Sequence, residues 1–417
     1  MSIIKIKNFG PIKAGYQEND GWIDIKKVTV FIGNQGSGKS TVAKLISTFT
    51  WIEKVLVRGD YNTKWFEETN KLKNLLKNHR IESFFNDKTE IEYLGDAYQI
   101  EYKTDKLKIS EISKTEYVLP QIIYQPAERN LLSYVKTYKS LELTSPALIN
   151  YATAFDAALI EMGHNNEILN LPINDLSMEY DWVNKSINLK GLDYKINLNE
   201  ASSGVQSIVP LYLVTRHLAS LVRNQLVFDE PKTSIEELER FKNSATEILN
   251  SYTLTDEQKK VAISILASRF NKKSFINIVE EPEQNLFPSS QKEMLWCLLF
   301  FNNFGYVDLP QNKKNKLIFT THSPYIVNYL SLAIQGYYLL GKIKSNEILL
   351  NKLKAIIPLE SVISAEDVAI YELDEKTGSI KKLPNFEGIP SDNNFLNNSL
   401  AEGNKLFDSL LEIEEEL

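Results

Sequence analysis

The feature that most constrains this 417-residue chain is a glycine-rich segment, GNQGSGKS, at residues 33–40. It fits the pattern G-x-x-x-x-G-K-[ST], follows a β-type run at residues 27–32, and precedes a segment at residues 41–57 whose apolar residues recur at helical spacing. Between a strand and a helix, glycines let successive backbone N–H groups point inward at phosphate groups, and the helix N-terminus adds a positive dipole. The segment therefore predicts the phosphate-binding loop of an α/β P-loop NTPase.

We expect this loop to bind ATP and Mg²⁺. Lys39 would reach the β and γ phosphates and assist catalysis there, and the Ser40 hydroxyl would bind the metal ion. An ordinary glycine-rich turn is the alternative. Such a turn does not need to match every defined position of the pattern G-x-x-x-x-G-K-[ST], as this segment does, and it does not need a strand before it and a helix after it. The expected nucleotide-binding residues of this segment are Gly33, Asn34, Gln35, Gly36, Ser37, Gly38, Lys39, Ser40 and Thr41.

A second apolar run, at residues 275–279, ends in two adjacent carboxylates, Glu280 and Glu281. Because side chains alternate along a strand, neighbours at its end can do different work. Glu280 would hold the Mg²⁺ ion with its water shell, and Glu281 would orient and deprotonate the attacking water. Two glutamates after a strand are, on their own, more often a solvated turn. The phosphate-binding loop in the same chain favours the catalytic interpretation.

A third apolar run, at residues 316–321, is followed directly by His322. If the strands are parallel, His322 lies at the same edge of the sheet as the two glutamates, where it would sense the γ-phosphate. A surface or hydrogen-bonded core histidine is the alternative. The other histidines, His79, His164 and His217, lie in helical or polar stretches, and we expect no special role for them.

Composition narrows the class of protein. Hydrophobic residues make up 43% and charged residues 24%, as in globular proteins, and the net charge of −7 argues against a surface that coats nucleic acid, although it leaves room for a local basic groove. The single cysteine, Cys297, excludes a disulfide within the chain or a cysteine-rich metal site. The N-terminal segment has no apolar stretch of signal-peptide length, and charged residues interrupt the long apolar runs, so we expect a cytoplasmic protein.

The order of these motifs across residues 3–325 resembles that of the ABC-type ATPases, specifically the SMC, RecF and OLD (overcoming lysogenisation defect) branch. The segment ASSGVQ at residues 201–206 is similar to a degenerate form of the family signature LSGGQ. In the family, the signature of one subunit closes over the nucleotide of the other, so Ser203, Gly204 and Gln206 would contact ATP held by a second chain. On its own, Ser-Ser-Gly is merely a helix cap.

The resemblance also covers the phrase QPAER at residues 125–129. Gln125, at the end of a predicted strand, looks like the family glutamine that senses Mg²⁺ and the γ-phosphate. Arg129 is one of few arginines in a lysine-rich chain. It would bind phosphate, brace a dimer or form a structural ion pair, and the residues alone do not choose between these roles.

The expected organisation is one ABC-type ATPase domain, built from residues 1–224 and 273–417, with a helical insertion at residues 225–272. Short β-type runs predict an antiparallel meander at residues 88–125. No long heptad tract occurs, so we expect no SMC-style coiled-coil arm. The Toprim domain that OLD nucleases carry needs a glutamate and paired aspartates with glycine nearby, and the tail from about residue 330 is too short and lacks that arrangement, so we expect an ATPase without its own nuclease.

The resemblance implies a dimer or higher homo-oligomer that couples ATP-driven closure to recognition of a partner or nucleic acid. Stand-alone ATPases of this kind often accompany a separate effector, typically a nuclease, in bacterial anti-phage systems, and the resemblance suggests that role. One alternative is a RecF-like DNA repair or recombination ATPase, which needs a basic face such as the lysine runs at residues 71–77 and 313–316 would provide. The other is the cytoplasmic subunit of a membrane transporter, against which the degenerate signature and the long insertion both count.

Overall fold

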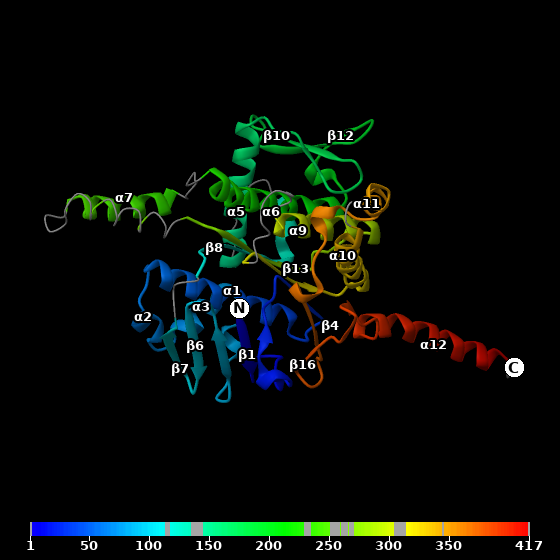
Figure 1. Ribbon diagram of the computed structural model, residues 1–417, viewed down its shortest axis with the longest axis horizontal. Coiled ribbons are helices and arrows are strands. Elements are labelled where there is room, and N and C mark those ends of the chain that lie inside the picture. The colour runs from blue at the N-terminus through cyan, green and yellow to red at the C-terminus, as the bar shows by residue number, and fades with distance from the viewer. Residues whose placement is uncertain are drawn as a thin grey trace.

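The computed structural model describes residues 2–112, 117–134, 145–228, 235–250, 259, 266, 271–303, 314–343 and 346–415. Within them, a seven-stranded sheet forms the centre of the molecule (Figure 1). Its strands, in spatial order, are β2 (Gly15–Tyr16), β16 (Ser379–Lys382), β15 (Val368–Leu373), β4 (Val28–Gly33), β14 (Lys316–Thr321), β13 (Ser274–Glu280) and β8 (Pro120–Gln125).

The middle of this sheet is parallel from β15 through β4, β14 and β13 to β8. β4 and β13 are buried at every residue, which suits their continuous apolar runs and a sheet covered on both faces. β16 joins β15 by an antiparallel hairpin. The three strands whose carboxyl ends carry the predicted motifs, β4, β14 and β13, are therefore direct neighbours that point the same way.

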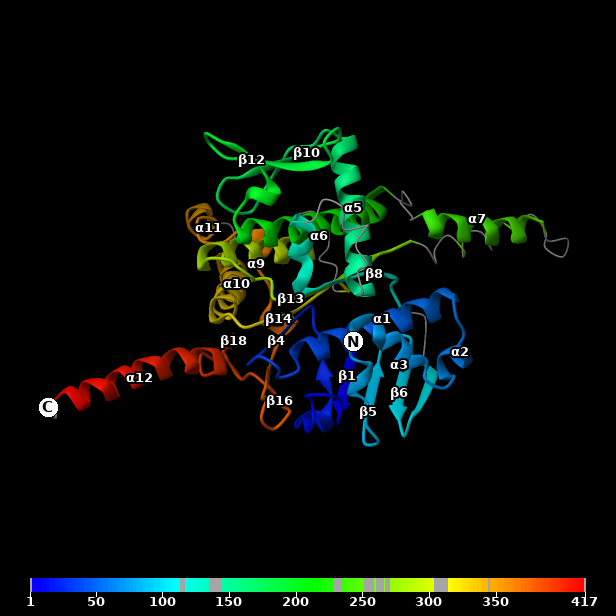
Figure 2. The same ribbon diagram turned by 180° about the vertical axis from the view of Figure 1, so that it is seen from behind.

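One face of the core sheet is covered by α1 (Lys39–Arg58), which begins at the glycine-rich loop. Beyond α1 lies an antiparallel sheet, visible in the lower part of Figures 1 and 2. Val42 and Phe49 of α1 share one hydrophobic core with Ile100 of this sheet and Ile278 of the core sheet. The strands of the antiparallel sheet, in spatial order, are β3 (Ile23–Asp24), β1 (Ile3–Lys7), β5 (Glu90–Leu94), β6 (Tyr98–Lys103) and β7 (Lys106–Glu111).

The predicted antiparallel meander at residues 88–125 is divided between the two sheets. β5, β6 and β7 pair antiparallel with one another, whereas β8 pairs in parallel with β13 in the core sheet. The apolar residues of β8 follow one another rather than alternating with polar ones, which fits a strand covered on both faces. β8 thereby brings the QPAER segment beside the two glutamates.

The opposite face of the core sheet is covered by helices, which lie in the upper part of Figures 1 and 2. They are α5 (Pro146–His164), α6 (Ser203–Phe228), α9 (Pro288–Asn302) and α10 (Pro324–Ile343), with α4 (Leu131–Tyr134) and α11 (Glu347–Lys354) beside them. A small antiparallel sheet packs on α5 and consists of β12 (Lys195–Asn197), β11 (Ser186–Lys190), β10 (Ser177–Asp181) and β9 (Leu169–Asn170).

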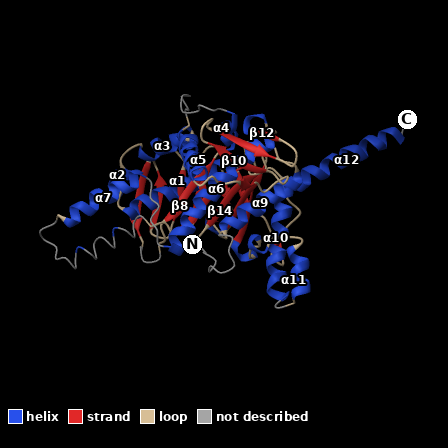
Figure 3. Cartoon of the chain, turned by 90° about the horizontal axis from the view of Figure 1, so that it is seen from above, coloured by secondary structure: helices blue, strands red, loops and turns tan. Residues whose placement is uncertain are grey.

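The remaining described elements are short or lie at the periphery. They are α2 (Thr63–Glu67), α3 (Lys71–Leu76), α7 (Ile235–Leu249), α12 (Phe395–Glu415), β17 (Asn385–Phe386), β18 (Ile389–Pro390) and the 3-10 helices Asn19–Gly21, Lys77–His79, Glu82–Phe84, Ala127–Asn130, Leu198–Glu200, Leu359–Ser361 and Ala365–Asp367. Figure 3 shows α7 and α12 extending from opposite sides of the central body. Most of the predicted insertion at residues 225–272 lies outside the described residues, apart from the end of α6, α7 and a few further positions.

Among the described residues, one helical stretch, Ser203–Leu226, is long and apolar enough by composition to cross a membrane. However, 78% of its most apolar window is buried inside the protein, so packing within the core accounts for its hydrophobicity.

Candidate nucleotide-binding site

The glycine-rich loop connects β4 to α1 in the middle of the core sheet. Gly33 has a φ of +142° and Gly38 a φ of +101°, in the region that favours glycine. A Cβ atom on Gly33 would lie 2.4 Å from the carbonyl oxygen of Leu373, so no larger residue fits there without a shift of the backbone. These two glycines let the chain turn sharply from the strand into the helix.

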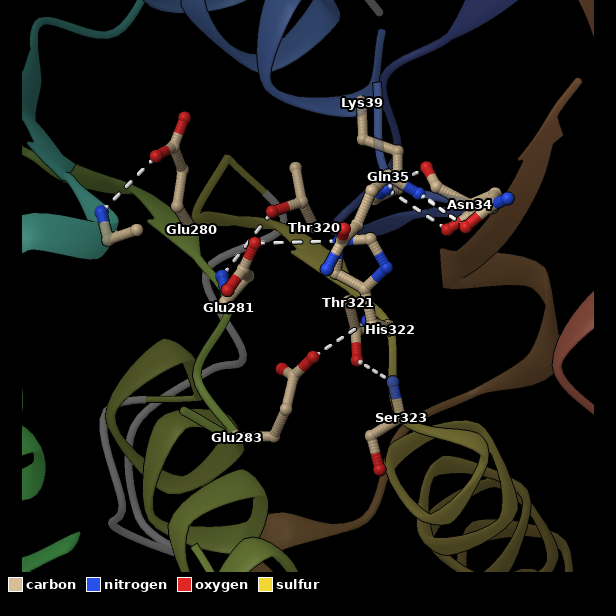
Figure 4. A network of polar contacts seen from close by, with 12 residues as sticks. Asn34, Gln35, Lys39, Glu280, Glu281, Glu283, Thr320, Thr321, His322 and Ser323 are labelled. Atoms are coloured by element: carbon tan, nitrogen blue, oxygen red, sulfur yellow. Dashed lines mark hydrogen bonds and ion pairs between the residues drawn. The ribbon is translucent and has the colours of Figure 1, made fainter. Parts of the chain in front are cut away.

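Lys39, the first residue of α1, is buried at 5% exposure. Its Nζ donates hydrogen bonds to the carbonyl oxygens of Gly33 (3.0 Å) and Asn34 (2.7 Å), and Figure 4 shows it beside Asn34. Burial lowers the pKa of Lys39 to about 8, although the negative charges of Glu281 and Glu283 oppose this change. The ammonium is thus held inside the loop by neutral oxygens, and phosphate oxygens would give it stronger hydrogen bonds, because both partners would then be charged.

Glu280 ends β13 and is 5% exposed. Its Oε1 accepts a hydrogen bond from the Tyr124 hydroxyl, and its Oε2 accepts one from the backbone N–H of Ala127 (3.2 Å). Lys44, on α1, places its Nζ 3.9 Å from Oε1. The carboxylate is therefore fixed in orientation at the wall of the site.

Glu281 leaves the strand in the left-handed conformation, with a φ of +44°. Its backbone N–H donates to the carbonyl oxygen of Thr320 (3.0 Å), and its Oε1 lies 3.5 Å from Nε2 of His322 (Figure 4). The hydrogen bond with His322, aided by the charges of Lys39 and Arg129, lowers the pKa of Glu281 below its usual value. Glu281 is therefore ionised at neutral pH and acts as an acceptor.

His322 follows β14 and is held through its backbone. Its N–H donates to Oε1 of Glu283 (2.7 Å), a carboxylate whose pKa is raised by burial. The ring is half-buried. It faces Glu281, as Figure 4 shows. The parallel pairing of β13 with β14 brings these side chains together, because Glu280 is in register with Thr320.

These residues line a cleft of about 600 Å³. From the predicted site it contains Gln35, Gly36, Gly38, Lys39, Ser40, Thr41, Glu280, Glu281 and His322. Gly33, Asn34 and Ser37 belong to the same loop but do not line the cleft. The structure thus gathers the loop, the acidic pair and the histidine in one place, although they are far apart in the chain.

Magnesium binding fits this cleft together with a nucleotide. Among the described residues, no group of three or more His, Cys, Asp or Glu side chains is placed to hold a metal ion by itself. Mg²⁺ bound with phosphates needs only one or two protein ligands, since phosphate oxygens and waters supply the others. Ser40 and Glu280, which both line the cleft, are suitable ligands of this kind.

Gln125 does not lie in the cleft, contrary to its predicted contact with Mg²⁺ and the γ-phosphate. It is fully buried, and its Nε2 donates to Thr215 Oγ1 (2.9 Å) and Asn277 Oδ1 (2.7 Å) on the α6 side of the sheet. The reason is the alternation of side chains along β8, which directs Tyr124 to the cleft and Gln125 to the opposite face.

The signature-like segment is divided between exposed and buried positions. Ser203 is exposed at the start of α6, and a Cβ on Gly204 would lie 2.7 Å from the carbonyl oxygen of Asn285. Neither residue lines the cleft of its own chain, and their contact with a second subunit stays a prediction.

Gln206 differs from its predicted contact with ATP. It is 2% exposed, and its Nε2 donates to the carbonyl oxygens of Leu198 (3.2 Å) and Asn199 (3.0 Å). Because α6 turns this position inward, Gln206 braces its own chain rather than facing a second one.

Several residues that sequence reasoning missed also line the cleft. His79, for which no role was expected, packs edge-on against Tyr124 with ring centroids 4.8 Å apart, and burial lowers its pKa to about 4. Arg80 and Lys44 join it. No local pattern distinguishes them, because the packing of distant elements brings them here.

Arg129 is not in the position that its predicted roles require. It is 0% exposed and does not line the cleft, so in this conformation it contacts neither phosphate nor a second subunit. Its guanidinium donates to three backbone carbonyl oxygens. Two of those carbonyls belong to Glu280 and Glu281, so its partners are main-chain groups rather than the carboxylate of an ion pair.

The comparison with protein families finds a match over residues 28–328, to the model described as "AAA domain, putative AbiEii toxin, Type IV TA system". No curated protein matches. Together with the parallel sheet and the loop between β4 and α1, the family match confirms the expected P-loop NTPase fold.

Solved structures with overall similarity include SMC head domains and an ATP-binding cassette. The SMC head domain from Thermotoga maritima has 9% identity and a TM-score of 0.36, covering 92% of this chain and 98% of that one. The Smc head domain with an extended coiled coil, bound to a ScpA domain derived from Pyrococcus furiosus, has 10% identity and a TM-score of 0.38, with coverage of 98% and 100%. A nucleotide-free ATP-binding cassette from an ABC transporter has 13% identity and a TM-score of 0.29, with coverage of 93% and 94%.

Proposed function

Because this chain belongs to the AAA domain family described as a putative AbiEii toxin of type IV toxin–antitoxin systems, we propose that it binds and hydrolyses ATP in the cleft beside the glycine-rich loop. The observation that carries the proposal is the convergence of Lys39, Glu281 and His322 on one cleft. A cation, an ionised carboxylate and a histidine at the carboxyl edge of a parallel sheet suit transfer of a phosphoryl group to water.

In the proposed reaction, the loop N–H groups and Lys39 bind the phosphates. Ser40 and Glu280 would hold Mg²⁺, which when bound would neutralise charge on the phosphates. Glu281 accepts a hydrogen bond from the attacking water and takes up its proton as the water oxygen bonds to the γ phosphorus. The bond from that phosphorus to the β–γ bridging oxygen breaks, ADP leaves with the bonding electrons, and the ring of His322 contacts the γ-phosphate. Positioning and electrostatic stabilisation of this kind supply most of the catalysis in phosphoryl transfer.

The proposed active unit is a homodimer. The loop and the acidic pair surround the cleft from one chain, while Ser203 lies exposed and outside that cleft. A contact from Ser203 and Gly204 of a second copy would complete the site. ATP binding would then stabilise the closed dimer, and closure of the dimer would strengthen ATP binding by the same free energy.

We further propose that the ATPase serves a bacterial anti-phage defence system and works with a separate effector protein such as a nuclease. The family description, which names a toxin–antitoxin system, supports this role.

The lysine runs give little support to the RecF-like alternative, because a lysine of each run is paired with a carboxylate of the same chain. In the first run, Nζ of Lys73 lies 3.4 Å from a carboxylate oxygen of Asp105. In the second run, Nζ of Lys314 lies 2.8 Å from a carboxylate oxygen of Asp96. Lysines that are paired within the fold attract DNA phosphates less strongly than a free basic face does.

The test is phosphate release by the purified protein with ATP and Mg²⁺, comparing wild type with Glu281→Gln. Wild type should hydrolyse ATP, and the variant should bind ATP but hydrolyse it at least about a hundredfold more slowly, because the general base is lost. His322→Ala should show a similar defect. Glu347→Gln, at an exposed position of α11, is the matched control and should keep wild-type activity. Equal rates for wild type and Glu281→Gln would refute the assignment.

A further inference from the structure

We propose that Arg129 is a positioning residue for hydrolysis, whose buried guanidinium fixes the turn that presents Glu281 to the cleft. The inference rests on the proposed function, since it assigns Arg129 a part in the same reaction. It gives the QPAER segment a role other than direct contact with ATP, with metal or with a second subunit.

The guanidinium of Arg129 makes hydrogen bonds to the main chain of both glutamates. Its Nη1 donates to the carbonyl oxygen of Glu280 (2.6 Å) and to that of Pro126 (3.2 Å), and its Nη2 donates to the carbonyl oxygen of Glu281 (2.6 Å). Hydrogen bonds from a charged donor are stronger than neutral ones, and the planar fork of arginine holds its acceptors in a fixed geometry. Two consecutive peptide carbonyls are thus tied to one rigid group.

This arrangement is specific to the turn at Glu281. In an extended strand, the carbonyls of successive residues point to opposite sides, so one side chain does not bind both. Here both accept from Arg129 because Glu281 departs from the strand with a φ of +44°. A left-handed conformation is unfavourable for a residue with a side chain, so surrounding contacts must maintain it. Arg129 supplies such contacts.

The same segment also holds the side chain of the neighbouring glutamate. The N–H of Ala127 donates to Oε2 of Glu280 (3.2 Å), so the QPAER segment binds the main chain of both glutamates and the side chain of one. On the other side of the turn, the N–H of Glu281 donates to Thr320 (Figure 4). With its backbone held from both sides, Glu281 keeps its carboxylate directed at His322.

Burial adds an electrostatic part to this role. Arg129 is 0% exposed, and taking its charge out of water is costly unless its donors are well used. The negative charges of Glu283, Glu281 and Glu280 act on it.

The first experiment combines Arg129→Lys with Glu281→Gln in a double-mutant cycle, measured as single-turnover hydrolysis of ATP and as ATP affinity. Lysine keeps the charge but does not hold both carbonyls in a fork. Arg129→Lys should lower the hydrolysis rate at least about tenfold with ATP affinity changed by less than about threefold, as expected for an effect on the transition state. In the Glu281→Gln background, the same change should have almost no further effect, because the group that Arg129 positions is absent.

The split between hydrolysis and affinity separates positioning from damage to the fold. A misplaced Glu281 should slow the hydrolysis step while ATP still binds, whereas damage to the cleft would weaken ATP binding as well.

Two controls test whether each variant is folded and whether an Arg→Lys change away from the cleft affects hydrolysis. Thermal unfolding of each variant shows whether the fold survives. Arg216→Lys is the matched control and should behave as wild type, because Arg216 pairs with Glu167 away from the cleft.

The outcomes are distinct. A wild-type hydrolysis rate for Arg129→Lys, a loss of ATP affinity as large as the loss of rate, or the same fold-change in rate in the wild-type and Glu281→Gln backgrounds would overturn the role of Arg129 while leaving the proposed ATPase intact. Absence of hydrolysis by the wild-type protein would overturn the proposed function, and this inference with it.

Discussion

Replacing Lys39 with methionine should stabilise the protein without nucleotide while removing its response to ATP. Lys39 is buried, and its Nζ donates to the carbonyl oxygens of Gly33 and Asn34. A charge in this position is useful for binding phosphate but unfavourable for the fold alone. Methionine retains most of the apolar stem and removes the ammonium.

The size of the effect follows from the pKa of Lys39. Burial lowers it from 10.5 to about 8, and one pKa unit corresponds to about 1.4 kcal/mol, so the charge destabilises the folded state by on the order of 3 kcal/mol. Methionine leaves two carbonyls to bond with water instead, at a cost of about 1 kcal/mol each or less. We therefore expect Lys39→Met to raise the free energy of unfolding by about 1–2 kcal/mol at neutral pH.

The sign of the pH dependence provides a second check. Below a pH of about 8, Lys39 is protonated in both the folded and the unfolded protein, so the full penalty is present. Between about 8 and 10.5 the unfolded chain binds more protons than the folded one, so the stability of wild type rises relative to the variant. The advantage of Lys39→Met should accordingly shrink across this interval.

The assay is urea unfolding across this pH range, with and without ATP and Mg²⁺, alongside Lys352→Met at an exposed position of α11 as the matched control. ATP at about a hundred times its dissociation constant should stabilise wild type by about 2.7 kcal/mol and leave Lys39→Met unchanged. A variant that loses stability at neutral pH, or a difference that does not vary with pH, would refute the desolvation argument. A variant that ATP still stabilises would refute the role of Lys39 in binding.

Two other substitutions test the dimer and the acidic pair. ATP with Mg²⁺ should increase the sedimentation coefficient of Glu281→Gln, because this variant does not hydrolyse the nucleotide and should accumulate as a closed dimer. The double variant that also carries Ser203→Arg should show no such increase, because the arginine should block closure. Ser399→Arg on exposed α12 is the control, and full hydrolysis by Ser203→Arg alone would indicate that this segment is only a helix cap. Tyr124→Phe removes a buried hydrogen bond to the acidic pair and should lower the free energy of unfolding in urea by about 1–3 kcal/mol, whereas Tyr325→Phe, at an exposed ring, should have almost no effect. Equal stability of the two tyrosine variants would contradict a structural role for the Tyr124 hydroxyl.

The sequence by itself determined the parts of the site that are contiguous in the chain. The glycine-rich loop is recognisable because its function needs fixed residue types at fixed spacing, between a strand and a helix that each have their own pattern. Glu281 and His322 could be predicted for a related reason, since each follows an apolar strand and parallel strands end at one edge of the sheet. In these cases the local sequence pattern is sufficient to predict where the residue lies in the fold.

Only the tertiary structure decided which side of an element faces the cleft and what distant residues join it. A polar residue at the end of β8 was predictable, but whether Gln125 or Tyr124 faces the site depends on the register of β8 against β13. The contacts of Arg129 depend on the left-handed turn at Glu281, more than a hundred residues further along the chain. His79 reaches the cleft by packing against Tyr124. Such long-range contacts leave no periodic signal, because they are set by how separate elements pack and not by the spacing of residues within one of them.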